Sequence, residues 1–178
     1  MTAPPPSSPT SDLDELLVHR PPMRWVDEVV AIGEREVHAR VHPKPTSLYV
    51  EAGAIPIIYT LEWMAQAIAV WGGARDRRKE AEGRDARSRE GYLVAIPSAE
   101  FECESLAPEG CFDIRTSLIW DNEDAAAFQG EVFRDEVRVA KARMSIVRRD
   151  GRTPLSSVAP SDASSDSSDS SDSASSES

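Results

Sequence analysis

Residues 56–71 read PIIYTLEWMAQAIAVW, the most apolar stretch of this 178-residue chain. The stretch is rich in strong helix formers, and proline is favoured in the first turn of a helix. The pair Gly72-Gly73 that follows is typical of a helix end. About 16 residues at a rise of about 1.5 Å span roughly 24 Å, which is short for a membrane crossing. We therefore expect a helix over residues 57–71 that is buried in a protein core.

The segments on either side of this helix have the apolar–polar alternation of strands. Two strands are expected before it, over residues 25–32 and 36–41, and a short helix over residues 13–19 precedes them. The charged residues 75–90 predict either a solvated helical extension or a mobile loop. Four further strands are expected over residues 91–104, 112–120, 126–133 and 137–147, with hairpin turns at 122–124 and 134–136.

Two strands, one apolar helix and about four antiparallel strands together predict one architecture. A single apolar helix needs a sheet to cover it, and a curved antiparallel sheet does so with one face. We therefore predict an α+β hotdog fold over residues 13–150, in which a curved antiparallel sheet wraps around one buried central helix.

Both ends of the chain are predicted to lie outside this domain. Residues 1–12 are rich in Pro and Ser, and residues 151–178 form a Ser/Asp-rich acidic tail. Neither can bury enough apolar surface to offset the entropy of ordering, so we expect both to be disordered. The formal net charge of −11 disfavours nucleic acid and anionic membranes as partners, because both need basic patches.

The N-terminal residues and the two cysteines bear on location and cofactors. Residues 1–12 carry no hydrophobic leader, which disfavours a secretory signal. Cys103 and Cys111 do not have the spacing of zinc ligands and are expected to be free thiols. We therefore expect a cytoplasmic protein with no metal and no other cofactor.

The apolar helix carries a polar face. Tyr59, Glu62 and Gln66 follow the i, i+3, i+7 spacing that places side chains on one side of a helix. A carboxylate inside an apolar helix is costly unless it is paired, hydrogen-bonded or protonated. Glu62 is therefore either a general acid or base that faces a substrate tunnel, or a structural residue that caps a loop or contacts a second subunit.

Two segments resemble a known family. Residues 17–23 (LVHRPPM), with Val26-Asp27, resemble the Leu-Pro-His-Arg-x-Pro…Val-Asp opening of 3-hydroxyacyl-[acyl carrier protein] dehydratases. Residues 56–66 resemble their Pro-Gly-x-x-x-x-Glu-x-x-Ala-Gln central helix. The match is closer to the aryl-polyene-type branch of these dehydratase-like proteins, whose helix reads Glu-Tyr-Met-Ala-Gln-Ala-Ile-Ala.

The resemblance implies a dimer of hotdog subunits that acts on acyl chains bound to acyl carrier protein, with active sites at the subunit interface. In that family a His from the other subunit removes the α-proton of a 3-hydroxyacyl thioester, and an acidic residue helps the hydroxyl leave as water. Glu62 matches the acidic residue. Substrate binding would involve the helix start, whose N–H groups can hold a thioester carbonyl, and the polar face of the helix. These substrate-binding residues are Pro56, Ile57, Ile58, Tyr59 and Gln66.

The chain departs from the family where the catalytic His belongs. The corresponding position, fourteen residues before Glu62, is Leu48, and His19, His38 and His42 all lie earlier in the chain. We expect a structural role for His19, an exposed position for His38, and a side chain at His42 that points elsewhere.

Three functions remain open on these grounds. The chain is a dehydratase that converts 3-hydroxyacyl thioesters to trans-2-enoyl thioesters in fatty-acid-like or polyene synthesis, or a subunit of such an enzyme. Alternatively it is a non-catalytic partner of a His-bearing homologue, or a hotdog thioesterase in which the carboxylate activates water.

Overall fold

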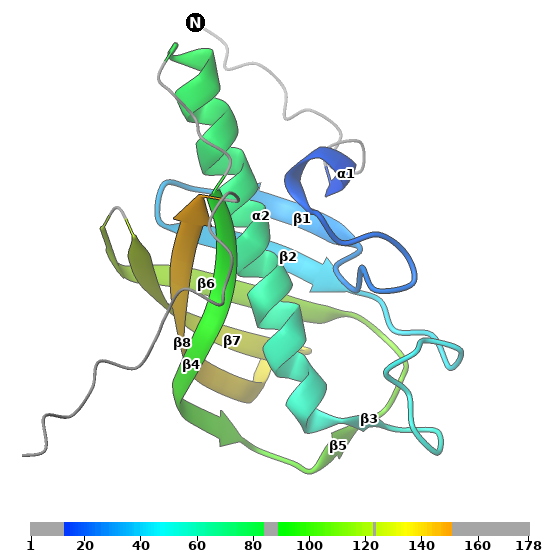
Figure 1. The fold of residues 1–178 in the computed structure, drawn as a ribbon. Coiled ribbons are helices and arrows are strands. Elements are labelled where there is room, and N and C mark those ends of the chain that lie inside the picture. Colours follow the sequence, from blue (N-terminus) through cyan, green and yellow to red (C-terminus); the bar gives the residue numbers. More distant parts are fainter. Residues whose placement is uncertain (1–12, 84–88, 123, 151–178) are drawn as a thin grey trace, which may run out of the picture.

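A six-stranded antiparallel sheet curves around one long helix, α2 (Thr60–Ala81), in the computed structural model (Figure 1). The structure describes residues 13–83, 89–122 and 124–150. The two segments predicted to be disordered, residues 1–12 and 151–178, lie outside this part. The arrangement confirms the predicted α+β hotdog fold.

All neighbouring strands of the large sheet are antiparallel. In spatial order they are β1 (Glu28–Ile32), β2 (Glu36–Val41), β6 (Phe112–Asp121), β7 (Ala125–Arg134), β8 (Val137–Asp150) and β4 (Arg89–Phe101). The remaining elements are a short helix, a two-stranded sheet and one turn of 3₁₀ helix: α1 (Leu13–Leu16), β3 (Ile55–Pro56) with β5 (Ser105–Leu106), and η1 (Ile57–Tyr59). In the described part of the chain, no helix is long and apolar enough to cross a membrane.

The alternation read from the sequence is confirmed on three strands, whose inward side chains pack under α2. Trp120 is an exception on β6, because the pairing with β7 shifts register between Leu118 and Trp120 and leaves the indole 43% exposed. The inward residues are Val37, Ala39 and Val41 on β2, Phe112, Ile114 and Thr116 on β6, and Ala140, Ala142 and Met144 on β8.

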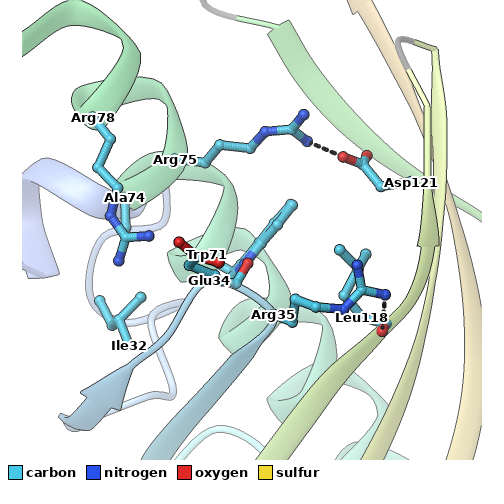
Figure 2. A pocket seen from close by; sticks show the side chains of 9 residues that line it. All are labelled: Ile32, Glu34, Arg35, Trp71, Ala74, Arg75, Arg78, Leu118 and Asp121. Carbon is cyan, nitrogen blue, oxygen red and sulfur yellow. Dashed lines mark hydrogen bonds and ion pairs between the residues drawn. The ribbon is translucent and has the colours of Figure 1, made fainter. Parts of the chain in front are cut away.

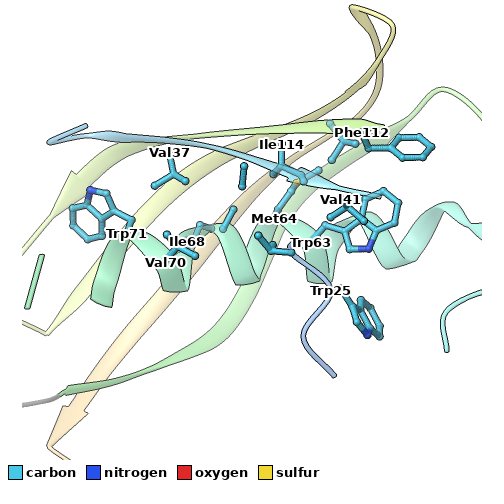
Figure 3. Close-up of a cluster of buried hydrophobic side chains, with 14 of the residues drawn as sticks. Trp25, Val37, Val41, Trp63, Met64, Ile68, Val70, Trp71, Phe112 and Ile114 are labelled. Atoms are coloured by element: carbon cyan, nitrogen blue, oxygen red, sulfur yellow. The ribbon is translucent and has the colours of Figure 1, made fainter. Parts of the chain in front are cut away.

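The core lies between α2 and the sheet (Figure 3). Trp63 is fully buried, and its ring centroid lies 5.2 Å from that of Phe112 on β6. Met64 packs against Gly130 of β7, where an added Cβ would come within 2.6 Å of the Met64 sulfur. Burying each large apolar side chain contributes roughly 1.5–3 kcal/mol, so this face of α2 stays against the sheet and fixes the rotation of the helix.

The hairpin between β7 and β8 matches its prediction closely. Asp135 and Glu136 both have positive φ, 50° and 62°, which is the conformation of a two-residue type I′ turn. This turn has the twist that antiparallel strands require, so it sets the register of β8 against β7.

The helix does not end at Gly72-Gly73, as predicted, but continues to Ala81. At Gly73 an added Cβ would lie 2.4 Å from the backbone oxygen of Leu16, so glycine is needed there for α1 to approach α2. An ion pair between Arg77 and Glu15 of α1 lies beyond this contact. Residues 75–81 are therefore the helical extension that was one of the two predicted alternatives.

The two glycines provide a matched test of this contact. An added Cβ at Gly72 meets no atom within 4 Å, whereas at Gly73 it overlaps the α1 backbone. We expect Gly73→Ala to lower the free energy of unfolding by about 1–3 kcal/mol. Gly72→Ala should raise it by up to about 1 kcal/mol, because alanine is the better helix former. Urea denaturation of both variants measures the difference, and equal effects would contradict the proposed contact.

Candidate active site

The polar face of α2 lies against the segment that leads into β1, and Gln66 makes the connection. Its side-chain nitrogen donates to the backbone oxygen of Met23 and to Glu62 Oε1, both at 2.9 Å. Its oxygen accepts from the backbone N–H groups of Trp25 at 2.8 Å and Val26 at 3.3 Å. All four hydrogen-bonding positions of this buried amide are therefore used.

These bonds also explain why β1 begins at Glu28 and not at Trp25, as predicted. The N–H groups of Trp25 and Val26 bond to a side chain of the helix instead of to a neighbouring strand. Gln66, predicted to line the substrate site, is thus held in a hydrogen-bond network. This network positions Glu62 and the segment that leads into β1, residues 17–27, which we call the opening segment.

Glu62 lies at the edge of this network. Its Oε1 accepts the hydrogen bond from Gln66, and in the described part of the chain no group bonds Oε2. The side chain is 38% exposed, so the deep burial expected from its place in an apolar helix is wrong for the single chain. The physical reason is that the opening segment covers Gln66 and leaves Glu62 open on one side.

His19 lies near Glu62, a proximity that the sequence interpretation did not predict. Its Nε2 lies 3.8 Å from Glu62 Oε1, and its side chain is 40% exposed. The buried Nδ1 has no hydrogen-bond partner among the described residues. The backbone around His19 is held by Arg20, whose guanidinium donates to the carbonyl oxygens of Asp14, Leu17, Val18 and His19. The LVHR motif signalled this residue, but only the folded chain shows its neighbour.

The other two histidines belong to a different network, on the side of the sheet away from α2. His38 Nε2 lies 2.5 Å from Asp113 Oδ1, and His42 Nε2 lies 3.8 Å from Glu28. Burial raises the pKa of Asp113, but hydrogen bonds from His38 and Arg40 outweigh this and bring the pKa below its usual value. His38 is half-buried and bonded, whereas it was predicted to be exposed.

The start of the helix offers fewer N–H groups than expected. Pro56 has none, and the N–H of Ile57 donates to the backbone oxygen of Glu104 at 3.0 Å. The Ile57 side chain is buried, whereas Ile58 is exposed and lies one helical turn before Glu62. Among the described residues the N–H of Ile58 has no backbone partner, so it stays available as a carbonyl-binding donor.

The hydroxyl of Tyr59 bonds to Glu51 and not to Glu62. It donates to Glu51 Oε1 at 2.5 Å, and this hydrogen bond raises the pKa of Tyr59. Its ring packs edge-on against Trp25 at 5.6 Å, and Trp25 in turn packs against Tyr49 at 4.7 Å. Tyr59 thus forms part of an aromatic wall that holds the loop before β3 against the opening segment.

Exposed apolar side chains occur in the segments that lead to His19, Gln66 and Glu62. Val18 precedes His19 in the chain, and Met23 accepts a hydrogen bond from Gln66 through its backbone oxygen. Ile58 lies four residues before Glu62. The side chains of Val18, Met23 and Ile58 are all exposed. Two hollows in the described part of the chain, one beside Trp71 and one beside His38, do not include Glu62. Exposed apolar surface around a carboxylate is typical of a site that a partner or ligand covers.

A second uncovered surface is the edge of the sheet at β4. This strand pairs with β8, and in the described residues no strand pairs with its other side. Its exposed apolar side chains are Leu93, Val94, Ile96 and Phe101. A long apolar edge of this kind favours association with another strand.

The fold, one central helix wrapped by a curved antiparallel sheet, defines a hotdog protein. The sequence profile of the ApeP-like family, described as ApeP dehydratase, matches residues 11–156. The chain belongs to this family. The match confirms the dehydratase-like family predicted from the opening motif and the helix motif.

Solved structures agree on the fold. The chain is similar to the dehydratase heterocomplex ApeI:P from Xenorhabdus doucetiae, with a TM-score of 0.70 and 21% identity over 82% of this chain and 94% of that one. It is also similar to an HP0420 homologue from Helicobacter felis, with a TM-score of 0.58 and 9% identity over 79% of this chain and 90% of that one. A hypothetical thioesterase with coenzyme A from Streptococcus pneumoniae TIGR4 is a further similar structure. Its TM-score is 0.52 and its identity 11%, over 71% of this chain and 88% of that one. No curated protein matches the sequence.

The network around Gln66 can be tested separately from catalysis. Gln66→Met keeps the length of the side chain but leaves buried backbone N–H groups without an acceptor. We expect a loss of about 1–3 kcal/mol in unfolding free energy for each such group. Amide hydrogens at Trp25 and Val26 should also exchange faster, as mass spectrometry can measure.

Glu62→Gln is the matched control, because its amide oxygen still accepts from Gln66. Its unfolding free energy should stay within about 0.5 kcal/mol of the wild type. A Gln66→Met protein as stable as the wild type would show that the network does not hold the opening segment.

Proposed function

We propose that this chain is the acid-bearing subunit of a hotdog dehydratase that acts with a His-bearing hotdog partner. The substrate would be a 3-hydroxyacyl thioester on acyl carrier protein, and the product a trans-2-enoyl thioester, in fatty-acid-like or polyene synthesis. The observation that carries the proposal is Glu62, which is oriented by Gln66 and remains 38% exposed on the central helix. Membership of the ApeP-like dehydratase family supports the reaction class.

The geometry around Glu62 suits a general acid. Because Oε1 accepts from Gln66, a protonated carboxyl would carry its proton on Oε2. In the proposed reaction a base removes a proton from C2 of the substrate, the C2–C3 double bond forms, and the C3–O bond breaks. The hydroxyl takes the Oε2 proton and leaves as water. Nothing is oxidised or reduced in this elimination, so it calls for no redox cofactor.

The start of the helix supplies the second element. Proton removal at C2 places negative charge on the thioester oxygen, which a backbone N–H at a helix start stabilises. We assign this role to the N–H of Ile58, because the N–H of Ile57 is bonded to Glu104. Ile58 and Glu62 lie one turn apart, so one substrate can reach both.

The base is proposed to come from the partner subunit. Leu48 occupies the position where related dehydratases carry their loop His. The similar structure from Xenorhabdus doucetiae is described as a heterocomplex, which supports a second, different subunit here. His19 is the competing candidate within this chain, because it lies 3.8 Å from Glu62. Its variant therefore belongs in the test.

Glu62→Gln tests the acid. The wild-type chain and the variant are each purified with the His-bearing homologue and given a 3-hydroxyacyl carrier-protein thioester, and the enoyl product is measured by mass spectrometry. We expect kcat to fall by about 10²–10⁴-fold, since an amide cannot donate the proton. Glu136→Gln removes an exposed carboxylate in the β7–β8 turn, away from the site, and should leave kcat unchanged. Equal rates for Glu62→Gln and the wild type would favour the non-catalytic partner.

The same assay decides the source of the base. The chain alone should be inactive, and His19→Gln in the complex should keep most of the rate. Turnover by the chain alone that His19→Gln abolishes would replace the partner His with His19. Hydrolysis of acyl-CoA by the complex at a rate above its dehydration would favour the thioesterase alternative.

The β4 edge is proposed as the surface that joins the two subunits. A lysine on an exposed edge strand disfavours pairing with a second strand. We expect Val94→Lys to dissociate the complex, as size-exclusion chromatography with light scattering measures. Val137→Lys, at an equally exposed valine beside the β7–β8 hairpin, should leave the complex intact. Dissociation by both variants, or by neither, would place the interface elsewhere.

A further inference from the structure

A hollow of about 290 Å³ lies at the other end of α2 from Glu62 (Figure 2). It is formed by the second half of α2, by the turn between β1 and β2, and by the end of β6. Trp71 contributes to its wall and follows Glu62 by nine residues, which is about 14 Å along the helix axis. The hollow is therefore separate from the proposed active site.

Arginine side chains dominate this hollow. Arg35, Arg75 and Arg78 surround it, and Arg148 lies 5.8 Å from the ring of Trp71. Its acidic residues are Glu34 and Asp121. Asp76, whose charge interacts with those of Arg75 and Arg148, adds a third carboxylate nearby. Four guanidinium groups thus outnumber three carboxylates, which leaves the hollow positively charged in an acidic protein.

The charge of Asp121 is already neutralised. Its Oδ2 lies 2.7 Å from Arg75, and its Oδ1 lies 2.7 Å from Arg148. Burial raises the pKa of Asp121, but the hydrogen bonds from Arg148 and Arg75 outweigh this and bring the pKa below its usual value. Asp121 therefore stays ionised at neutral pH and holds Arg75 and Arg148, but it leaves Arg78 without a counter-ion.

Arg78 is the unsatisfied cation of the hollow. Among the described residues its guanidinium has no hydrogen bond and no ion pair, whereas the adjacent Arg77 is paired with Glu15. Arg35 uses one nitrogen for the backbone oxygens of Leu118 and Ile119. The planar fork of a guanidinium matches a carboxylate, so Arg78 and the rest of Arg35 suit carboxylate ligands.

The chain itself carries a segment of matching chemistry. From Ser156 onward it has no basic residue and five acidic ones: Asp162, Asp166, Asp169, Asp172 and Glu177. This segment follows β8, and Arg148 near the end of β8 already contacts Trp71 and Asp121 beside the hollow. The twelve residues from Asp150 to Asp162 span about 20 Å as a flexible chain, so the hollow is within reach.

We propose that the acidic C-terminal segment, residues 156–178, binds the arginine-lined hollow of its own chain, where its Asp carboxylates accept hydrogen bonds from Arg78 and Arg35. Tethering of this kind produces an effective concentration in the millimolar range, so individually weak contacts suffice. The contact is electrostatic and is screened by salt. It does not depend on the proposed dehydratase activity.

Trp71 reports on the hollow in the full-length chain. The protein is prepared with fluorotryptophan, and its ¹⁹F signals are compared with those of a full-length variant whose tail acids are changed to amides. We expect the Trp71 signal, assigned with Trp71→Phe, to shift, while Trp25 and Trp63 at the other end of α2 stay unchanged. In the wild type, about 0.5 M salt should move the Trp71 signal to the position found in the neutralised variant. The changes in the tail are Asp162→Asn, Asp166→Asn, Asp169→Asn, Asp172→Asn and Glu177→Gln.

Two adjacent arginines provide the control. Arg78→Gln should abolish the response of Trp71 to tail neutralisation, whereas Arg77→Gln, outside the hollow, should preserve it. An unchanged Trp71 signal in the tail variant would overturn the proposal, as would equal shifts of all the tryptophans. Inorganic phosphate that shifts Trp71 equally with and without the tail charges would also overturn it and would assign the hollow to a free anion.

Discussion

The arrangement of the candidate site depends on one buried amide. Gln66 bonds at the same time to the backbone before β1 and to the carboxylate of Glu62, and all its donors and acceptors are satisfied. A buried amide left partly unbonded is costly, so this side chain has essentially one stable orientation. That orientation holds the opening segment on α2, brings His19 near Glu62, and turns the bonded oxygen of Glu62 inward.

Close backbone packing gives α2 its position between two neighbours. Gly130 on β7 leaves room for Met64, and Gly73 leaves room for the backbone of α1. Both glycines act through the missing Cβ and not through flexibility, since both sit within regular elements. The helix is therefore held by the sheet on one side and by the opening segment on the other.

The two ends of α2 have opposite chemistry. Near its N-terminal end lies the half-exposed carboxylate of Glu62, and the exposed apolar side chain of Ile58 lies four residues before it. At its C-terminal half, arginines surround Trp71 and outnumber the nearby carboxylates. One long helix thus places an apolar, acid-bearing surface and a cationic hollow far apart on the same subunit.

The sequence alone determined the order of elements and the hotdog architecture, because the alternation on β2, β6 and β8 and the apolar run before Trp71 are local patterns. The helix motif also singled out Glu62 and Gln66. Local patterns could not show that α2 passes through Gly72-Gly73, because the reason is a contact with Leu16 far away in the chain. Burial likewise depends on what covers a residue: the opening segment covers Gln66 and leaves Glu62 open, and it carries His19 to within 3.8 Å of that carboxylate. Such distances between remote segments arise only when the helix rotation is set by packing against the sheet, and this is the physical reason that the tertiary structure decided the site.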